Sequence, residues 1–186
     1  MKLRYIPNIL TSLRFLLVIP VLISLLTQQY ALALGLFLLA GLTDGLDGLL
    51  ARLYGWTSHF GAVADPLADK LLLTTSFIAL AYLGQIPIWL VVLVVVRDIW
   101  IMCGVLAYRY FIGELEFIPT GISKINTFLQ ILLVILVLVH LSFQTLPLIV
   151  LTGTMWLVAL TSLISLLHYT WIGSWLAIQK RSTGTC

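Results

Sequence analysis

Six long apolar stretches constrain this chain more than any other feature. Each is long enough to cross a lipid bilayer as a helix, which takes about 20 residues. The composition, with 61% hydrophobic and 9% charged residues, is typical of an integral membrane protein. The sequence therefore predicts an all-α fold, a bundle of six transmembrane helices in a single membrane domain spanning residues 1–186. The stretches are residues 8–26, 30–53, 65–83, 87–112, 122–143 and 147–171.

Positive charge predicts the orientation of these helices. The connections around residues 28, 85 and 144 contain no charged side chain, whereas Lys and Arg lie at the opposite helix ends. Because cytoplasmic segments are enriched in Lys and Arg, we expect both termini and the acidic residues described next to face the cytoplasm. A multi-pass protein of the bacterial inner membrane fits this pattern. The net charge of +3 fits attraction to anionic lipids, and we expect no nucleic-acid partner because the chain has no basic arm or domain.

Four of the seven acidic residues lie in one short window, at Asp44, Asp47, Asp65 and Asp69. An aspartate at the centre of a membrane helix costs about 2.5–3.5 kcal/mol. Two like charges about 5.5 Å apart repel by about 3 kcal/mol at an effective dielectric constant near 20. Spacings of three and four residues place each pair on one helix face, and a short loop makes the two helices antiparallel neighbours. Something strongly cationic is therefore expected among these carboxylates.

The ligand types in this window indicate which cation to expect. Several carboxylates with no cysteine nearby favour Mg²⁺ or Mn²⁺ over Zn²⁺, and His59, on the predicted connecting loop, is the only histidine close in sequence. Arg52 beside bound metal ions would suit a phosphate-containing substrate. The alternative is a proton relay or a cation transporter. The clustering of acids on one side, the absence of a sequence repeat and the presence of Arg52 argue against transport.

The acidic window resembles the signature of the CDP-alcohol phosphotransferase family. The pattern Asp-Gly-x-Asp-Gly-x-x-Ala-Arg, eight residues, then Gly-x-x-x-Asp-x-x-x-Asp is filled at every fixed position between residues 44 and 69. This resemblance implies a six-helix membrane enzyme, usually a homodimer, that moves a phosphatidyl or related group from a CDP-linked donor to an alcohol and releases CMP. It also implies roles for individual residues: Asp44, Asp47, Asp65 and Asp69 hold two Mg²⁺ or Mn²⁺ ions, Asp69 is the catalytic base, and Asp47, Gly48 and Arg52 bind the CDP moiety.

Residues outside the signature resemble the phosphatidylglycerophosphate synthase and cardiolipin synthase branches of this family. The first segment is the run from Ile6 to Arg14, where Asn8 and Arg14 share one stripe of the first helix. We expect Arg14 to face protein or a polar cleft, with snorkelling to the bilayer interface as the alternative. The remaining residues are Arg97 in the fourth stretch and Lys124, Asn126 and Thr127 in the fifth. With Asn8 and Arg14, they form the implied acceptor and lipid-phosphate site: Asn8, Arg14, Arg97, Lys124, Asn126 and Thr127.

Two positions separate the branches. Synthases that use glycerol 3-phosphate resemble one another in having an extra arginine and an extra lysine where this chain has Val105 and Asn126. Each charged hydrogen bond missing from a phosphate dianion removes about 1.5–3 kcal/mol. The Ser-Lys-x-Asn-Thr form resembles cardiolipin synthases that use CDP-diacylglycerol, and implies phosphatidylglycerol as acceptor. Phosphatidylglycerophosphate synthase is the second candidate.

Overall fold

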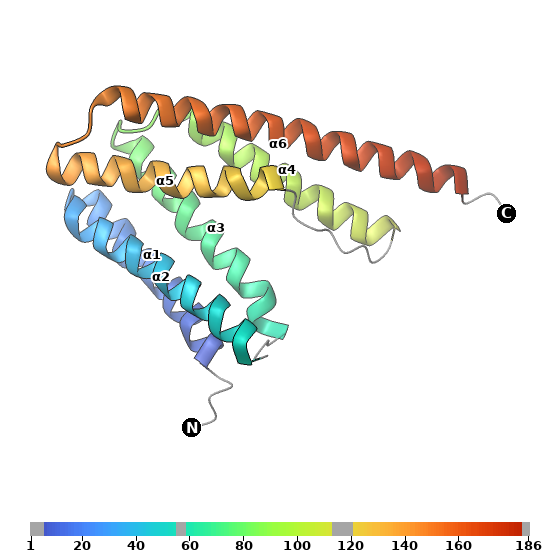
Figure 1. Cartoon of the computed structure of the whole chain (residues 1–186), viewed down its shortest axis with the longest axis horizontal. Coiled ribbons are helices and arrows are strands. Elements are labelled where there is room, and N and C mark those ends of the chain that lie inside the picture. Colours follow the sequence, from blue (N-terminus) through green and yellow to red (C-terminus); the bar gives the residue numbers. More distant parts are fainter. Residues whose placement is uncertain (1–5, 55–58, 113–120, 184–186) are drawn as a thin grey trace. The chain divides into compact units, whose positions relative to one another are not determined.

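Helices are the only regular secondary structure in the described part of the chain. A computed structural model describes the backbone of residues 6–54, 59–112 and 121–183, and the side chains of residues 13–45, 68–104 and 121–171. Within these ranges no strand occurs, and the helices are joined by short connections (Figure 1). The prediction of an all-α fold is thus confirmed for the described residues. The helices are α1 (Ile6–Leu26), α2 (Tyr30–Tyr54), α3 (His59–Tyr82), α4 (Ile88–Ile112), α5 (Gly121–Phe143) and α6 (Leu148–Thr183).

Two helix ends differ clearly from the expected boundaries. Helix α3 begins at His59 instead of Asp65, so His59 is not on a loop and Pro66 lies inside the helix. The prediction started the helix at Asp65, with Pro66 in its first turn, but a proline's fixed φ is compatible with a helix, and α3 begins six residues earlier. Helix α6 continues to Thr183, twelve residues beyond Trp171. Hydropathy marks where the apolar stretch stops, and a helix can continue past that point as a polar extension.

Three short connections use residues in the left-handed backbone region. Gln28, Gly84 and Gln144 have φ values of 58°, 73° and 52°. At Gly84 this conformation carries no steric cost, and the amide of Gln85 closes the helix end by donating to the carbonyl of Leu80 at 2.9 Å. The connection that the sequence predicts around residue 85 is thus confirmed.

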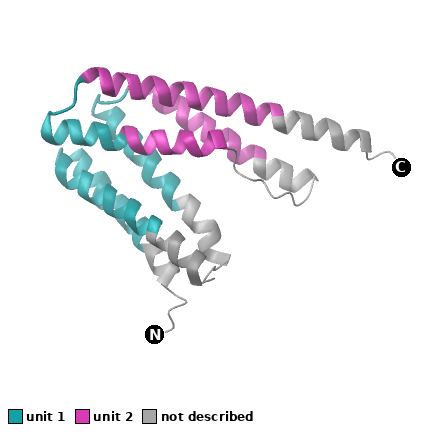
Figure 2. Ribbon diagram, in the orientation of Figure 1, with its two compact units in different colours: residues 1–86, 134–147 teal, residues 87–133, 148–186 magenta. Residues whose placement is uncertain are grey.

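The contacts divide the chain into two compact units, coloured separately in Figure 2. Unit 1 comprises residues 1–86 and 134–147, and in it α1 packs against both α2 and α3. Unit 2 comprises residues 87–133 and 148–186, and in it α4 packs against α6. Helix α5 contributes its first half to unit 2 and its second half to unit 1.

Buried stripes at helical spacing explain the packing within unit 1. In α1, Leu17, Val21 and Leu25 are buried, and in α2, Ala33 and Ala40 are fully buried. Small residues such as these alanines let neighbouring helix backbones come close. Arg14 belongs to the buried stripe of α1.

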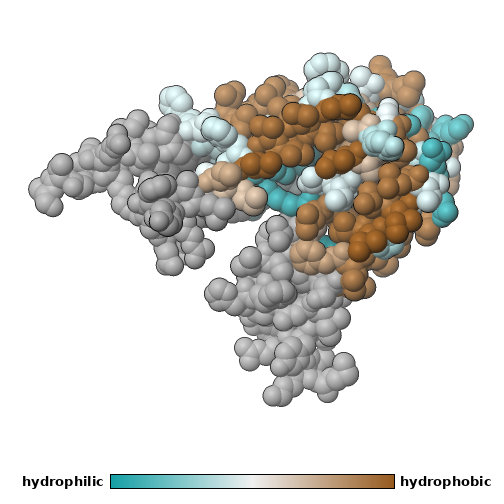
Figure 3. All heavy atoms as spheres, turned by 180° about the vertical axis from the view of Figure 1, so that it is seen from behind, coloured by the Kyte–Doolittle hydropathy of each residue, from teal (hydrophilic) through white to brown (hydrophobic). Residues whose placement is uncertain are grey.

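Many large apolar side chains of the described residues are exposed. They cover much of the coloured surface in Figure 3, and Leu16, Trp156 and Leu167 are each more than 60% exposed. Among the described residues, Gly121–Phe143 and Leu148–Trp171 are long and apolar enough to cross a membrane. Exposed apolar surface of this kind suits contact with lipid or with another protein. The six-span arrangement and the cytoplasmic position of both termini stay predictions.

Candidate active site

A buried arginine joins the two ends of the acidic window. Arg14 of α1 has no exposed surface, and its Nη1 donates a hydrogen bond to Oδ1 of Asp69 in α3 at 2.8 Å. Its Nη2 lies 2.7 Å from Oδ1 of Asp44 in α2. One guanidinium therefore contacts carboxylates from two other helices, and all three helices belong to unit 1.

Local sequence places each of these groups next to a buried stripe. Arg14 lies three residues before Leu17, on the inward side of α1. Asp44 follows the buried Thr43, whose hydroxyl donates to the carbonyl of Ala40 at 2.8 Å. Asp69 likewise follows the fully buried Ala68 of α3. Helix periodicity thus aims the three charged side chains toward one region of unit 1.

The charges in this cluster are unequally exposed. The Arg14 side chain is 0% exposed, whereas the side chains of Asp44 and Asp69 are 46% and 40% exposed. A charge buried this completely is tolerated only when partners compensate for its lost hydration, and here two carboxylates do so. Among described residues, the Nε and Nη2 atoms of Arg14 make no hydrogen bond, so the contact with Asp44 is an ion pair without hydrogen-bond geometry.

The sequence predicted part of this arrangement. The expectation that Arg14 faces protein or a polar group instead of lipid is confirmed, because its head group meets two carboxylates. Asp44 and Asp69 share Arg14 as a cationic partner, and the Mg²⁺ or Mn²⁺ ions expected among the aspartates stay a prediction. Sequence reasoning did not pair these residues, although a buried arginine in an apolar helix calls for a carboxylate partner. This requirement could have indicated, from the sequence alone, that Arg14 pairs with an aspartate.

Other predicted site residues are placed only by their helices. Asp47, Gly48 and Arg52 lie in α2, Asp65 lies in α3 and Asn8 lies in α1, and their side chains are outside the described residues. Within the described side chains there is no group of three or more acidic, histidine or cysteine residues. The two described carboxylates are hard oxygen donors that fit Mg²⁺ or Mn²⁺. Two metal ions held by all four aspartates remain a prediction.

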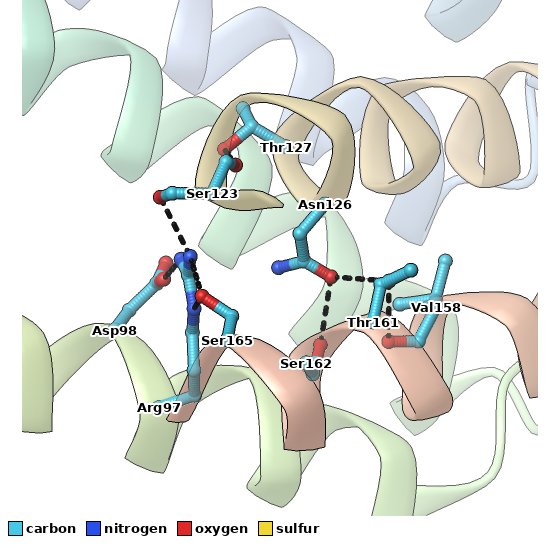
Figure 4. A network of polar contacts seen from close by, with 9 residues as sticks. All are labelled: Arg97, Asp98, Ser123, Asn126, Thr127, Val158, Thr161, Ser162 and Ser165. Carbon is cyan, nitrogen blue, oxygen red and sulfur yellow. Dashed lines mark hydrogen bonds and ion pairs between the residues drawn. The ribbon is translucent and has the colours of Figure 1, made fainter. Parts of the chain in front are cut away.

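A second polar cluster lies in unit 2, where Arg97 of α4 is nearly fully buried (Figure 4). Its Nη1 donates to Oδ1 of Asp98 at 2.6 Å. Its Nη2 donates to the hydroxyls of Ser123 in α5 and Ser165 in α6, both at 2.7 Å. Its Nε also donates to Ser165, at 3.2 Å. The guanidinium therefore connects three helices, and Asp98 balances its charge.

Asn126 of α5 lies beside this cluster and is fully buried. Its amide oxygen accepts hydrogen bonds from Thr161 at 2.8 Å and Ser162 at 3.0 Å, both in α6. Within the described part of the chain its amide nitrogen has no hydrogen-bond partner. In Figure 4 that nitrogen points toward the side on which Arg97 lies. One turn further along α5, the buried Gln130 also has an amide nitrogen without a described partner.

Two more of the predicted acceptor residues, Lys124 and Thr127, lie on the same turn of α5 as Asn126, whereas Asn8 and Arg14 lie in α1. Lys124 is exposed, and the hydroxyl of Thr127 donates to the backbone carbonyl of Ser123 at 3.1 Å. The structure thus brings Arg97 and Asn126 into one polar region with hydroxyls from α6. Sequence reasoning missed Thr161, Ser162 and Ser165, although their spacing puts them on one face of a largely apolar part of α6.

In the described residues the fold is all-α. Its apolar helices contain two buried arginines, each in contact with partly exposed aspartates. A family model described as CDP-alcohol phosphatidyltransferase matches residues 4–176. The chain belongs to this family.

The relatives carry two different names. The chain is 38% identical over 148 residues to a cardiolipin synthase (CMP-forming) of Rattus norvegicus, covering 69% of this chain and 48% of that protein. It is 37% identical over 148 residues to the Homo sapiens protein of the same name, with the same two coverages. It is 38% identical over 130 residues to a probable phosphatidylglycerophosphate synthase of Mycobacterium tuberculosis, covering 66% of this chain and 60% of that protein. The chain spans about half the length of the two cardiolipin synthases.

Proposed function

We propose that this chain transfers a phosphatidyl group from CDP-diacylglycerol to phosphatidylglycerol, forming cardiolipin and releasing CMP. Membership of the family supports the transferase class. The choice of acceptor rests on the charges of the polar cluster in unit 2, where Arg97 is paired with Asp98. There the buried arginine is already paired with a carboxylate, and a neutral amide stands where a second cation would be needed for a phosphate dianion.

On the donor side, Asp44, Asp47, Asp65 and Asp69 would hold two Mg²⁺ or Mn²⁺ ions. When bound, these ions would neutralise the pyrophosphate of CDP-diacylglycerol and the charge that develops on the departing CMP. Asp47, Gly48 and Arg52, all in α2, would receive the CDP moiety.

The reaction needs one proton acceptor. Asp69 suits this role because its carboxylate is partly exposed while one of its oxygens is held by Arg14. The terminal hydroxyl of phosphatidylglycerol attacks the phosphatidyl phosphorus, the bond from that phosphorus to the CMP oxygen breaks, and the hydroxyl proton passes to Asp69. CMP leaves with the electron pair of the broken bond.

On the acceptor side, the buried groups of unit 2 favour a ligand that brings little charge. Arg97 donates to Asp98 and to two serines, so its charge is balanced and its hydrogen bonds are engaged. The amide of Asn126 retains one end without a described partner and suits a hydroxyl or an ester oxygen. Lys124, being exposed, supplies a positive charge for the single phosphodiester of phosphatidylglycerol.

The setting of this activity is also part of the proposal. The exposed apolar surface and the two membrane-length helices support an integral membrane enzyme. We further propose a homodimer whose active site opens toward the cytoplasm.

A competition between acceptors tests this function. Full-length protein in mixed micelles receives CDP-diacylglycerol together with equal amounts of phosphatidylglycerol and glycerol 3-phosphate. We expect cardiolipin to be the main product, because the site lacks the cations needed to hold a dianion. If phosphatidylglycerophosphate dominates instead, the second candidate of the sequence analysis, whose name one relative carries, replaces this proposal. Asp69→Asn is the control and should form either product at least about a hundredfold more slowly, which would show that both come from this site.

A further inference from the structure

Arg14 has no substrate-facing surface, yet it contacts two of the residues on which the proposed chemistry depends. It is among the largest fully buried side chains of the described residues. Its two terminal nitrogens lie 2.8 Å from Asp69 and 2.7 Å from Asp44. Because no atom of Arg14 is exposed, its effect on the proposed chemistry would pass through the two carboxylates instead of through the lipid-phosphate contact that the resemblance implied.

The arrangement of buried and exposed atoms gives this effect a direction. Arg14, whose side chain is fully buried, contacts Oδ1 of each carboxylate. The side chains of Asp44 and Asp69 are nevertheless 46% and 40% exposed, so each aspartate joins a buried partner to the surface. A carboxylate held on one oxygen by a buried donor presents its other side in a fixed orientation, which is how groups behind a metal ligand orient it.

The planar shape of the guanidinium matters as much as its charge. Two nitrogens at a fixed separation reach carboxylates on two different helices, and so set the distance between them. Asp44 and Asp69 come from α2 and α3, while the arginine comes from α1. The first helix thereby controls the spacing of ligands that it does not itself provide.

We propose that Arg14 is a positioning residue that holds Asp44 and Asp69 at the separation needed for divalent cation binding. This inference rests on the proposed function only in taking these two aspartates as metal ligands. The opposite idea, that Arg14 occupies the place of a metal ion and competes with it, predicts the opposite effect of its removal on metal affinity.

Mn²⁺ binding to the full-length protein in detergent, followed by electron paramagnetic resonance without any substrate, tests the proposal. Arg14→Gln should weaken Mn²⁺ binding by about tenfold or more, as is usual when a group behind a metal ligand is lost. Arg14→Lys keeps the charge but has no fork to span both carboxylates, and should fall between wild type and Arg14→Gln. Unchanged or tighter binding by Arg14→Gln would overturn the proposal.

Arg97→Gln is the matched control. It removes another nearly fully buried arginine that bonds an aspartate, but in unit 2. A general loss of stability should therefore appear in both glutamine variants, whereas reduced Mn²⁺ affinity should appear only at Arg14. If Arg14→Gln does not fold, Arg14→Lys decides the question, because wild-type affinity in that variant would overturn the proposal. If wild-type protein itself binds no Mn²⁺, the metal assignment of the proposed function fails, a result distinct from a failure at Arg14 alone.

Discussion

Replacing Asp69 by asparagine is expected to lower turnover by about two to four orders of magnitude, the usual contribution of a general base. Asparagine has nearly the same size and keeps an oxygen that can accept the hydrogen bond donated by Arg14. It cannot accept the proton from the attacking hydroxyl. The measurement is CMP release at saturating CDP-diacylglycerol and phosphatidylglycerol, with donor binding measured separately. Donor binding should survive better than turnover.

Asp44→Asn provides the comparison for this result. Its carboxylate meets the same guanidinium through the same kind of oxygen, but the proposal gives it a role in metal binding only. Donor affinity should therefore fall in Asp44→Asn more than in Asp69→Asn. Near-normal turnover in Asp69→Asn would assign the base to another group.

Removing divalent metal is expected to abolish turnover completely and reversibly. Four aspartates that converge, as the sequence predicts, would repel one another, and the CDP pyrophosphate would add further negative charge that bound cations would neutralise. Excess EDTA should stop CMP release, and added Mg²⁺ or Mn²⁺ should restore it. Asp44→Asn should lose Mn²⁺ binding while its helical circular dichroism stays that of the wild type. Full activity in excess EDTA would contradict the metal assignment.

The sequence predicts the helices well because each apolar stretch is long and is bounded by turn-forming residues. The stretch at residues 30–53 corresponds to α2 within one residue at its C-terminal end. The start of α3 and the end of α6 were less predictable, because neither a start signal such as Asp65-Pro66 nor the end of an apolar stretch prevents a helix from continuing. Thus α3 begins at His59 and α6 ends at Thr183.

The residues of the candidate site could be predicted from the sequence, but the contacts of Arg14 with Asp44 and Asp69 could not. The spacing within the window placed the aspartates on shared helix faces, yet it said nothing about α1. The contact of Arg14 with Asp44 and Asp69 depends on how three helices pack, over sequence separations of 30 and 55 residues. The hydroxyls that α6 contributes to the second cluster were missed for a related reason. Single serines and threonines in an apolar helix usually bond their own backbone, as the hydroxyl of Thr154 does with the carbonyl of Val150.

The transfer of the phosphatidyl group to phosphatidylglycerol is tested most directly by following both products at once. Full-length protein receives phosphatidylglycerol and CDP-diacylglycerol labelled in its phosphatidyl phosphorus, and labelled lipid and CMP are measured over time. The account predicts that labelled cardiolipin and CMP appear in equal amounts, and that both appear at least about a hundredfold more slowly with Asp69→Asn. CMP released without labelled cardiolipin would contradict it.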